Sequence, residues 1–243
     1  MSLERFIIIP DTHGKLLDRD SWKVVRNFLG DYKPSIRIHL GDLFDLKGLR
    51  RAADPKDEAD DIQEDWQTGL TILDNLKPTH FMAGNHDWRL WNLLDDTRGL
   101  VRSFASSLIK DFMSELKAMN CHFFPYDARR GVLTIGRMKV IHGYHCGIGA
   151  ARLHAQIYGN VIYGHTHAIE SAPVPGIMER QARSIGCLCQ LDQPYMAAKT
   201  GKLRWRHGFG YGTINNKTGR FHFCQAQKLD GIWTLSAAFK DYV

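Results

Sequence analysis

The stretch FIIIPDTH, Phe6–His13, joins a run of four apolar residues to a carboxylate and an imidazole. Four consecutive apolar side chains predict a strand that is buried on both faces, as in a parallel sheet. Asp11 and His13 follow directly, so they are expected where this strand ends. Open α/β sheets place their chemistry at the carboxyl ends of strands. This one stretch therefore indicates both a fold class and the position of a site.

The same arrangement recurs further along the chain. Between the first two occurrences, the apolar residues Trp22, Val25, Phe28 and Leu29 have helical spacing, which gives the strand–helix–strand order of a parallel sheet. A short apolar run ends in a polar motif each time. These runs and motifs are 36–40 with GDLFD (41–45), 79–83 with GNHD (84–87), 137–141 with His142-Gly143, and 161–163 with GHTH (164–167).

The motifs together supply a set of metal ligands. Asp11 and His13, two residues apart on a loop, can turn toward one ion, and the Asp42 carboxylate can bridge two cations. Asn85 offers a hard amide oxygen. Each motif alone could be an ordinary loop, but their joint occurrence in this order is hard to reconcile with chance. The expected ligands are Asp11, His13, Asp42, Asn85, His142, His165 and His167, with His145 as a less favoured rival to His142.

In these motifs the chain resembles the calcineurin-like metallophosphoesterases, whose pattern is D-x-H, G-D-x-x-D, G-N-H-D/E, H and G-H-x-H. The resemblance implies an α/β fold, a β-sandwich flanked by helices in four α/β/β/α layers. It also implies how two metal ions are shared. The first would bind Asp11, His13, Asp42 and His167, and the second Asp42, Asn85, His142 and His165.

The resemblance further implies a phosphoesterase mechanism. Two ions about 3.5–4 Å apart hold the attacking and leaving oxygens of a phosphoryl transfer and acidify a bridging water. The resulting hydroxide would attack phosphorus in line. His86 matches the histidine that protonates the leaving oxygen, and Asp45 would hydrogen-bond His86 and fix its tautomer. Asp87 is expected to cap a helix or to support a ligand.

We expect one domain, 1–243, with helical insertions or a cap at 46–76 and 88–120. The acidic run 54–65 in the first of these is interpreted as a solvated helix face. The second has apolar residues at helical spacing and should bury one face. Gly208, Gly210 and Gly212 alternate with larger residues late in the chain, which predicts a second sheet that completes the sandwich.

Composition bears on the partners and the compartment. The net charge of +6 over 243 residues favours polyanionic partners, although many basic surfaces bind none. The apolar run near the start is too short for a signal peptide or a membrane span, so no membrane partner is expected. Without a secretory signal, the five cysteines are expected to be reduced in a cytoplasm. Cys187 and Cys189 could hold a third metal, but ordinary buried cysteines are the favoured interpretation.

A basic segment, Lys199–His207, combines positive charge with an aromatic residue. Lys202, Arg204, Trp205 and Arg206 are therefore candidate substrate-binding residues that would follow a phosphate backbone and stack on a base. A basic loop without a ligand is an equally weighted alternative. The segment 186–208 also resembles uncharacterised phage-borne metallophosphoesterases, which points to a phage- or prophage-encoded chain that acts in a host cytoplasm.

Departures within the family narrow the expected activity. GDLFDLKG at 41–48 lacks the G-D-x-V-D-R-G pattern of Ser/Thr protein phosphatases, and Asp45 stands where purple acid phosphatases have tyrosine. G-N-H-D also occurs in the nuclease of the double-strand-break repair complex and its bacterial and phage relatives. The sequence thus predicts a manganese-dependent phosphodiesterase that cuts DNA, with iron, zinc, nickel or cobalt also compatible. The alternatives are a phosphomonoesterase, a small-nucleotide phosphodiesterase or, less favoured because no ligand is missing, a catalytically idle binding module. No oligomeric partner is indicated.

Overall fold

Strand β1, formed by the first apolar run, lies inside a seven-stranded sheet. The computed structural model describes residues 3–50, 62–177, 180–192 and 200–235. The order in this sheet is β12-β11-β10-β1-β2-β3-β4, with β1 to β4 parallel and β10 to β12 antiparallel. Its strands are β1 (Leu3–Ile9), β2 (Ile36–His39), β3 (His80–Met82), β4 (His122–Phe124), β10 (Gly208–Asn215), β11 (Phe221–Leu229) and β12 (Ile232–Thr234).

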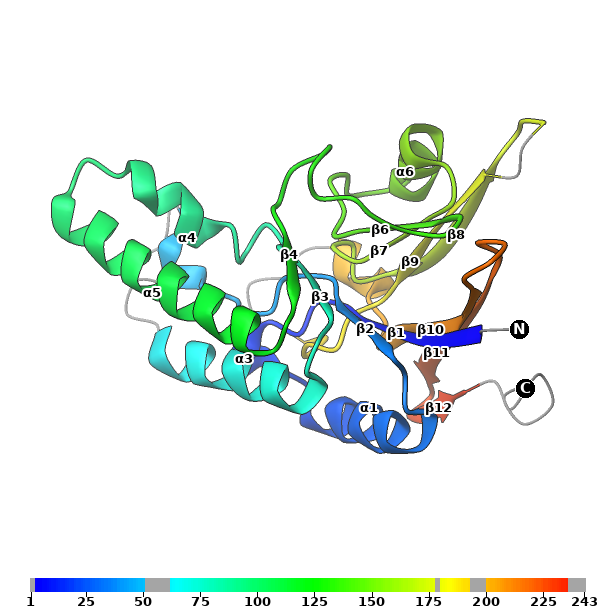
Figure 1. Ribbon diagram of the computed structural model, residues 1–243, viewed down its shortest axis with the longest axis horizontal. Coiled ribbons are helices and arrows are strands. Elements are labelled where there is room, and N and C mark those ends of the chain that lie inside the picture. Colours follow the sequence, from blue (N-terminus) through cyan, green and yellow to red (C-terminus); the bar gives the residue numbers. More distant parts are fainter. Residues whose placement is uncertain (1–2, 51–61, 178–179, 193–199, 236–243) are drawn as a thin grey trace.

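A second sheet of five strands packs against the first (Figure 1). Its order is β5-β6-β7-β9-β8, and β6, β7 and β9 run parallel. The two motifs that contain His142 and His165 follow strands of this second sheet. Its strands are β5 (Leu133–Ile135), β6 (Met138–Ile141), β7 (Val161–Tyr163), β8 (Ile169–Val174) and β9 (Arg180–Ile185).

The glycine-rich segment 208–215 does not form the second sheet, and that expectation was wrong. As β10 it pairs antiparallel with β1 in the first sheet. The ring of Tyr211 packs against Phe28 and Tyr32 of a helix. On the other face, a Cβ on Gly212 would lie 2.6 Å from the Phe6 ring. Alternation predicts a strand, but these long-range contacts decide which sheet the strand joins.

Helices cover both outer faces of the two sheets (Figure 1). Helix α1 begins after Asp18, whose carboxylate accepts a hydrogen bond of 2.8 Å from the Ser21 amide, and ends at Lys33, which has a left-handed backbone. The α-helices are α1 (Arg19–Tyr32), α3 (Ile62–Leu76), α4 (Arg89–Asn92), α5 (Gly99–Ala118) and α6 (Ala150–Tyr158). The 3₁₀ turns are η1 (Gly14–Leu16), η2 (Lys47–Leu49), η3 (Leu93–Asp95) and η5 (Thr200–Arg204).

Three apolar clusters separate four layers of secondary structure. Residues Ile7 and Ile9 of β1 pack toward the helical layer that contains α1, α3 and α5. The alternate residues Phe6 and Ile8 face the second sheet. A third cluster lies between the second sheet and α6, where Ala155 is buried. This arrangement confirms the four-layer α/β/β/α fold, and β1 is buried on both faces as its sequence predicts.

The two helical stretches connect parallel strands of the first sheet. Within 46–76, η2 and α3 lie between β2 and β3, and within 88–120, α4, η3 and α5 lie between β3 and β4. The acidic residues at 54–61 fall outside the described residues. Asp65 does not lie on a solvated face, because its side chain is buried. It accepts backbone hydrogen bonds from Asp45 and Leu46, which satisfy the buried carboxylate.

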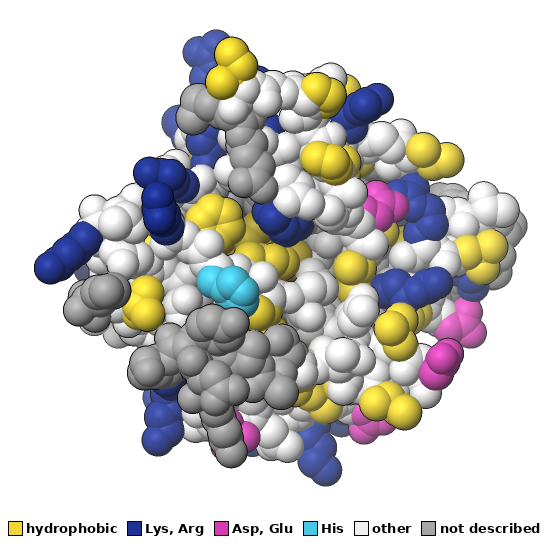
Figure 2. Space-filling model, turned by 90° about the vertical axis from the view of Figure 1, so that its right-hand side faces the viewer, with side chains coloured by type: hydrophobic (Ala, Val, Ile, Leu, Met, Phe, Trp, Pro, Cys, Tyr) yellow, Lys and Arg dark blue, Asp and Glu magenta, His cyan; other side chains and the backbone are white. Residues whose placement is uncertain are grey.

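Positive charge is dispersed over the surface that Figure 2 shows. Lys and Arg side chains are scattered around this face and do not gather in one patch. Among the described residues, no helix combines the length and the apolar composition that crossing a membrane requires. Net charge alone therefore does not locate a binding surface on this face.

Candidate metal centre

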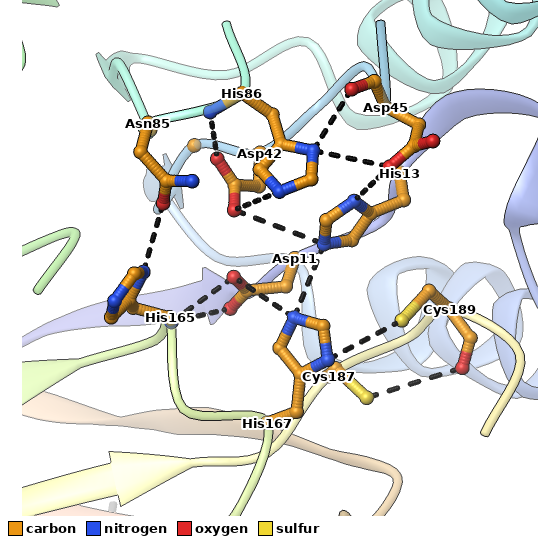
Figure 3. Close-up of polar contacts among 12 residues, drawn as sticks. Asp11, His13, Asp42, Asp45, Asn85, His86, His165, His167, Cys187 and Cys189 are labelled. Atoms are coloured by element: carbon orange, nitrogen blue, oxygen red, sulfur yellow. Dashed lines mark hydrogen bonds and ion pairs between the residues drawn. The ribbon is translucent and has the colours of Figure 1, made fainter. Parts of the chain in front are cut away.

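The ligand motifs from the two sheets meet where their strands end (Figure 3). Asp11 and His13 follow β1, and Asp42 follows β2. His142 and His165 come from the second sheet, after β6 and β7. All seven expected ligands therefore lie on loops that leave the carboxyl ends of parallel strands, and these loops face each other across the sandwich.

The backbone of these loops is strained at the ligands. Non-glycine residues rarely adopt positive φ angles, and each such residue costs about 1–3 kcal/mol unless its surroundings impose it. Hydrogen bonds impose it here, since the His13 amide donates to the Asp42 carbonyl at 2.9 Å and the His165 amide donates to the Asp11 carboxylate at 3.0 Å. The ligands concerned are Asp11 (φ 30°), His13 (51°), Asp42 (48°), His165 (64°) and His167 (57°).

Two motif glycines allow the loops to approach closely. A Cβ on Gly84 would lie 2.1 Å from Oδ1 of Asp42, and one on Gly164 would lie 2.3 Å from Oδ2 of Asp11. Real side chains do not approach that closely. The glycines of GNHD and GHTH are thus required by the carboxylates of two other motifs, which ties together segments far apart in the sequence.

The first group of ligands contains two imidazoles and two carboxylates. Nε2 of His13 lies 3.1 Å from Nε2 of His167. Nε2 of His167 also lies 3.6 Å from Oδ1 of Asp11, and Nε2 of His13 lies 3.8 Å from Oδ2 of Asp42. All four residues are buried. This group matches the ligand set that the family pattern implies for the first ion.

The second group contains Asp42, Asn85, His142 and His165. Oδ1 of Asn85 lies 3.1 Å from Nε2 of His142 and 2.8 Å from Nδ1 of His165. Nε2 of His142 lies 3.5 Å from Oδ2 of Asp42. Burial, followed by the neighbouring His142, lowers the pKa of His165 to about 4, which keeps that ring neutral. A neutral imidazole is the form that binds a metal.

Asp42 belongs to both groups. Its Oδ2 faces His13 of the first group and His142 of the second, while Oδ1 accepts a hydrogen bond of 2.8 Å from the His86 amide. Burial disfavours its charged form, but the imidazoles of His142 and His86 outweigh this and hold the pKa of Asp42 well below its usual range. A buried carboxylate that stays ionised between two sets of ligands is suited to bridge two cations.

The hydrogen-bond pattern of the second group fits a cation. Nδ1 of His142 donates to the Leu40 carbonyl at 2.7 Å, so in the neutral ring Nε2 carries a lone pair. That lone pair faces the Asn85 oxygen, which is also an acceptor. In the second group, two acceptors that face each other in a buried site are stabilised by a positive charge between them.

In the first group, Nδ1 of His13 faces the Asp45 carboxylate and its Nε2 faces Nε2 of His167. Burial lowers the pKa of His167, but Cys189 and Asp11 raise it by more, so without a metal a proton on His167 can be donated to His13. The oxygen and nitrogen donors of both groups fit divalent metal ions.

His86 lies beside the Asp42 carboxylate. Its Nδ1 donates to the Asp45 carbonyl at 2.8 Å, and its Nε2 lies 4.0 Å from Oδ2 of Asp42. Burial lowers the pKa of His86, but the Asp42 and Asp45 carboxylates raise it by more, so the net shift is upward. Oδ1 of Asp45 lies 3.1 Å from Nδ1 of both His86 and His13. Asp45 therefore orients the expected ligand His13 as well as His86. The sequence predicted the contact with His86 but not the contact with His13.

Two further carboxylates hold the GDLFD loop. Oδ1 of Asp87 accepts from the amides of Leu43 and Phe44, and Oδ2 accepts from the Gly84 amide at 2.8 Å. Asp87 thus connects two motif loops. Burial and the nearby Asp42 charge raise the pKa of Asp87 to about 7. Asp65 performs the same task from α3, and no motif in the sequence marks it.

Side chains behind His167 come from the segment that precedes β10. Sγ of Cys189 lies 3.8 Å from Nδ1 of His167, and the Trp205 ring packs on the same imidazole with centroids 4.3 Å apart. Cys187 contacts the carbonyls of Cys189 and Arg206. Cys189 and His167 together with His13 also form a cluster of three metal-binding side chains. Trp205, a candidate for base stacking, packs against the expected metal ligand His167.

The basic candidates lie near Trp205, but ion pairs engage two of them. Lys202 pairs with Asp192 at 2.9 Å, and Arg204 pairs with Glu170. Arg206 donates to the carbonyls of Leu203 and Trp205. Lys199 falls outside the described residues. The structure therefore brings Trp205 to the metal centre, whereas Lys202 and Arg204 face carboxylates.

A four-layer α/β/β/α fold with seven candidate metal ligands at its strand ends is the arrangement of a metal-dependent phosphoesterase. The chain belongs to the calcineurin-like phosphoesterase family, whose model matches residues 4–168 and so includes every expected ligand. This match confirms the family that the motifs indicate.

Relatives of known sequence include two phage proteins. The chain is 26% identical to the Gene 54 protein of Mycobacterium phage D29 over 87% of this chain and 89% of that protein. It is also 26% identical to the Gene 54 protein of Mycobacterium phage L5, over 68% and 69%. Similar solved structures include Yfce, a phosphoesterase from E. coli (13% identity, 91% and 97% covered, TM-score 0.36). A phosphatase from Mycoplasma pneumoniae is another (9% identity, 93% and 94% covered, TM-score 0.43).

Proposed function

We propose that the chain hydrolyses phosphodiester bonds, with DNA as its substrate, at a centre of two divalent metal ions. The observation that carries this proposal is the pair of ligand groups that share Asp42, with His86 held beside them. Asp11, His13, Asp42 and His167 would hold one ion. Asp42, Asn85, His142 and His165 would hold the other.

The residues around the two ions would have separate roles in the reaction. When bound, two ions fix the phosphate oxygens and acidify a water for attack on phosphorus. His86 is positioned to give a proton to the leaving oxygen, because Nδ1 is engaged by Asp45 and Nε2 points toward the shared carboxylate. The Asp42 and Asp45 carboxylates favour the protonated imidazole that this role requires.

Manganese is the metal we propose. The ligand atoms of both groups are carboxylate and amide oxygens and imidazole nitrogens, which suit manganese and also iron, zinc, nickel or cobalt. The nearby thiol of Cys189 contacts Nδ1 of His167, whereas Nε2 is the nitrogen that faces the other ligands. A soft sulfur ligand is therefore not part of the proposed set.

A small-nucleotide phosphodiesterase or a phosphomonoesterase is the second candidate. The ion pairs of Lys202 with Asp192 and of Arg204 with Glu170 favour it, because they neutralise cations that would follow a longer backbone. The phage relatives support action in a bacterial host cytoplasm under either candidate.

One assay separates these candidates. The manganese-loaded protein is given bis-p-nitrophenyl phosphate, p-nitrophenyl phosphate, single-stranded DNA and double-stranded DNA. We expect both the chromogenic diester and DNA to be cleaved faster than the monoester. Faster cleavage of the monoester would establish the phosphomonoesterase instead, and cleavage of the small diester without DNA would establish the small-nucleotide enzyme.

Binding of DNA can be assigned to a surface by its salt dependence. Replacing Lys202, Arg204 and Arg206 by Ala should reduce the slope of log affinity against log salt by about 0.7–0.9 for each DNA phosphate that the variant no longer neutralises. The matched control replaces the exposed Lys110, Arg152 and Lys217, which changes net charge equally. Equal slopes for the two triple variants would remove the basic segment from the proposed DNA-binding surface.

A further inference from the structure

We propose that a groove formed by η2, α4, η3 and the start of α5 binds the nucleoside next to the scissile phosphate. This inference rests on the phosphodiesterase function proposed above. The groove has a volume of about 1140 Å³, and Arg50, Asn85, Arg89, Leu100 and Phe104 are among the residues that line it. In Figure 1 these elements lie on the side of the molecule where α4 and α5 project from the sandwich.

The groove begins at the metal centre. Asn85 is a ligand of the second group, and its side chain also forms part of the groove wall. Arg89 lies at the same junction, because its guanidinium donates to the carbonyls of Asp45 and Leu46 at 2.5 and 3.2 Å. A phosphoester bound at the metals would therefore extend one of its organic groups into this groove.

The groove is larger than a phosphate needs. Sites for small molecules are commonly about 300–1,000 Å³, a size that holds a group such as a nucleoside. The volume of about 1140 Å³ leaves room for such a group in addition to the phosphate. A site that bound phosphate alone would need a smaller pocket, without the residues that α5 contributes.

The groove combines positive charge with apolar surface. Arg89 supplies positive charge beside Asp45, and Arg98 in the groove lining forms an ion pair with Asp96 at 2.9 Å. From α5, the apolar residues Leu100, Val101 and Phe104 line the groove. Helix α5 buries Ala105, Phe112 and Leu116 but leaves Leu100 84% and Phe104 47% exposed. Positive charge and exposed apolar side chains complement an anionic phosphate joined to a flat apolar group.

Polar side chains in the groove favour a nucleobase over an acyl chain. Asn92 and Asp95 also line the groove. An acyl chain would leave their hydrogen-bonding groups without partners, whereas the edge of a base offers donors and acceptors to them. The aromatic ring of Phe104 adds a surface on which a base can stack. These features together select a nucleoside as the occupant.

The test compares esters with the same leaving group. Methyl p-nitrophenyl phosphate, octyl p-nitrophenyl phosphate and the p-nitrophenyl ester of thymidine 5′-monophosphate differ in the second organic group, so the chemical step is matched. The groove variant carries Leu100→Ala and Phe104→Ala. The control variant carries Leu153→Ala and Ile157→Ala on α6, where 45% and 57% of the side chains are exposed.

The parent should prefer the thymidine ester over the methyl ester in kcat/KM. The groove variant should lose roughly 10-fold on the thymidine ester, as expected when a base loses its stacking surface, and should keep its rate on the methyl ester. The control variant should match the parent on both. Equal ratios in all three proteins would overturn the inference while leaving the phosphodiesterase intact. A preference for the octyl ester that the groove variant loses would assign the groove to an acyl chain and overturn it as well.

If the protein is not a phosphodiesterase, a binding measurement still tests the groove. If the parent cleaves no diester, calorimetric binding of thymidine 5′-monophosphate is measured against inorganic phosphate. Tighter binding of the nucleotide by the parent than by the groove variant would still support the groove. Equal binding by the two proteins would overturn it.

Discussion

Single polar side chains in this protein serve two neighbours at once. One oxygen of Asp45 contacts both His13 and His86, and the Asp87 carboxylate joins the loops that carry Asp42 and Asn85. Because these groups are buried, removing one side chain leaves the polar groups that it contacted without a hydrogen-bond partner and without access to water. Changes at single residues should therefore affect metal binding, proton transfer and stability in separable ways.

The first prediction separates the proton donor from the ligands. His86→Ala should retain metal but lose roughly 10²–10⁴-fold in turnover of alkyl diesters, whose leaving oxygen needs a proton. The loss on nitrophenyl esters should be smaller, because nitrophenolate leaves without one. Metal analysis and kinetics on both substrates check this, with His222→Ala on β11 as a control. Equal losses on the two substrates would show that His86 positions phosphate instead.

The second prediction concerns the thiol behind His167. Nδ1 of His167 faces Sγ of Cys189 while Nε2 faces the other ligands, so the thiol helps to fix which nitrogen binds metal. Cys189→Ala should weaken metal binding by about 10–100-fold, and Cys189→Ser should weaken it less. Competition with a chelator measures this, and the exposed Cys146→Ala is the control. Unchanged affinity in Cys189→Ala would limit the thiol to packing.

The third prediction is a pH dependence of stability. His39 is buried, its Nδ1 accepts from the Gly41 amide at 3.1 Å, and burial lowers its pKa to about 3. In the unfolded chain the pKa is about 6.5, so the stability that neutral His39 contributes is complete above that pH and declines as pH falls toward 3.

The parent should therefore be more stable than His39→Gln at pH 7, and this difference should shrink at pH 6, 5 and 4. Urea unfolding with a chelator present measures the difference without a contribution from metal release. A difference that stays constant with pH would contradict the assigned protonation state.

At the scale of elements, the helix α3 supports the loop that carries Asp42. Its Asp65 accepts amides of that loop, and the Phe44 ring stacks on Trp66 with centroids 4.5 Å apart. A Cβ on Gly69 would lie 2.2 Å from the same Phe44 ring. Helix α3 and the loop that carries Asp42 are thus in direct contact, so a change in one should displace the other.

The fourth prediction compares two helical glycines. Alanine is favoured over glycine in helices by about 1 kcal/mol, but overpacking costs about 1–3 kcal/mol. Gly69→Ala should therefore lower the free energy of unfolding and reduce activity, because Phe44 and with it Asp45 must move. Gly30→Ala in α1 has no atom within 4 Å of the added Cβ and should raise stability. Denaturant unfolding of both variants is the check, and a stabilised Gly69→Ala would contradict the packing described.

Local elements were largely predictable from sequence, whereas their partners were not. Strands form immediately before each motif, that is, before Asp11, Asp42, Asn85, His142 and His165. A short apolar run bounded by glycine or polar residues is typical of a buried strand, so these elements could be predicted. The place of β10 and the burial of Asp65 depend on contacts with segments far away in sequence. The spacing of apolar residues along the sequence gives no information about such long-range contacts.

At the scale of the whole molecule, the candidate site belongs to neither sheet alone. The first sheet supplies Asp11, His13, Asp42 and Asn85, and the second supplies His142, His165 and His167. The order of the motifs indicated which residues assemble. The groove beside Asn85 was not predictable, because α4 and α5 form it only after both helices pack against the sandwich.

The most direct test of the central claim is metal stoichiometry. The parent, Asp42→Asn and Asp111→Asn on the surface of α5 are stripped with a chelator, equilibrated with manganese and analysed for bound metal. We predict two ions per chain in the parent and in Asp111→Asn, and fewer in Asp42→Asn, because both ligand groups lose a shared negative charge. Two ions in Asp42→Asn, or fewer than two in the parent, would contradict a dinuclear centre bridged by Asp42.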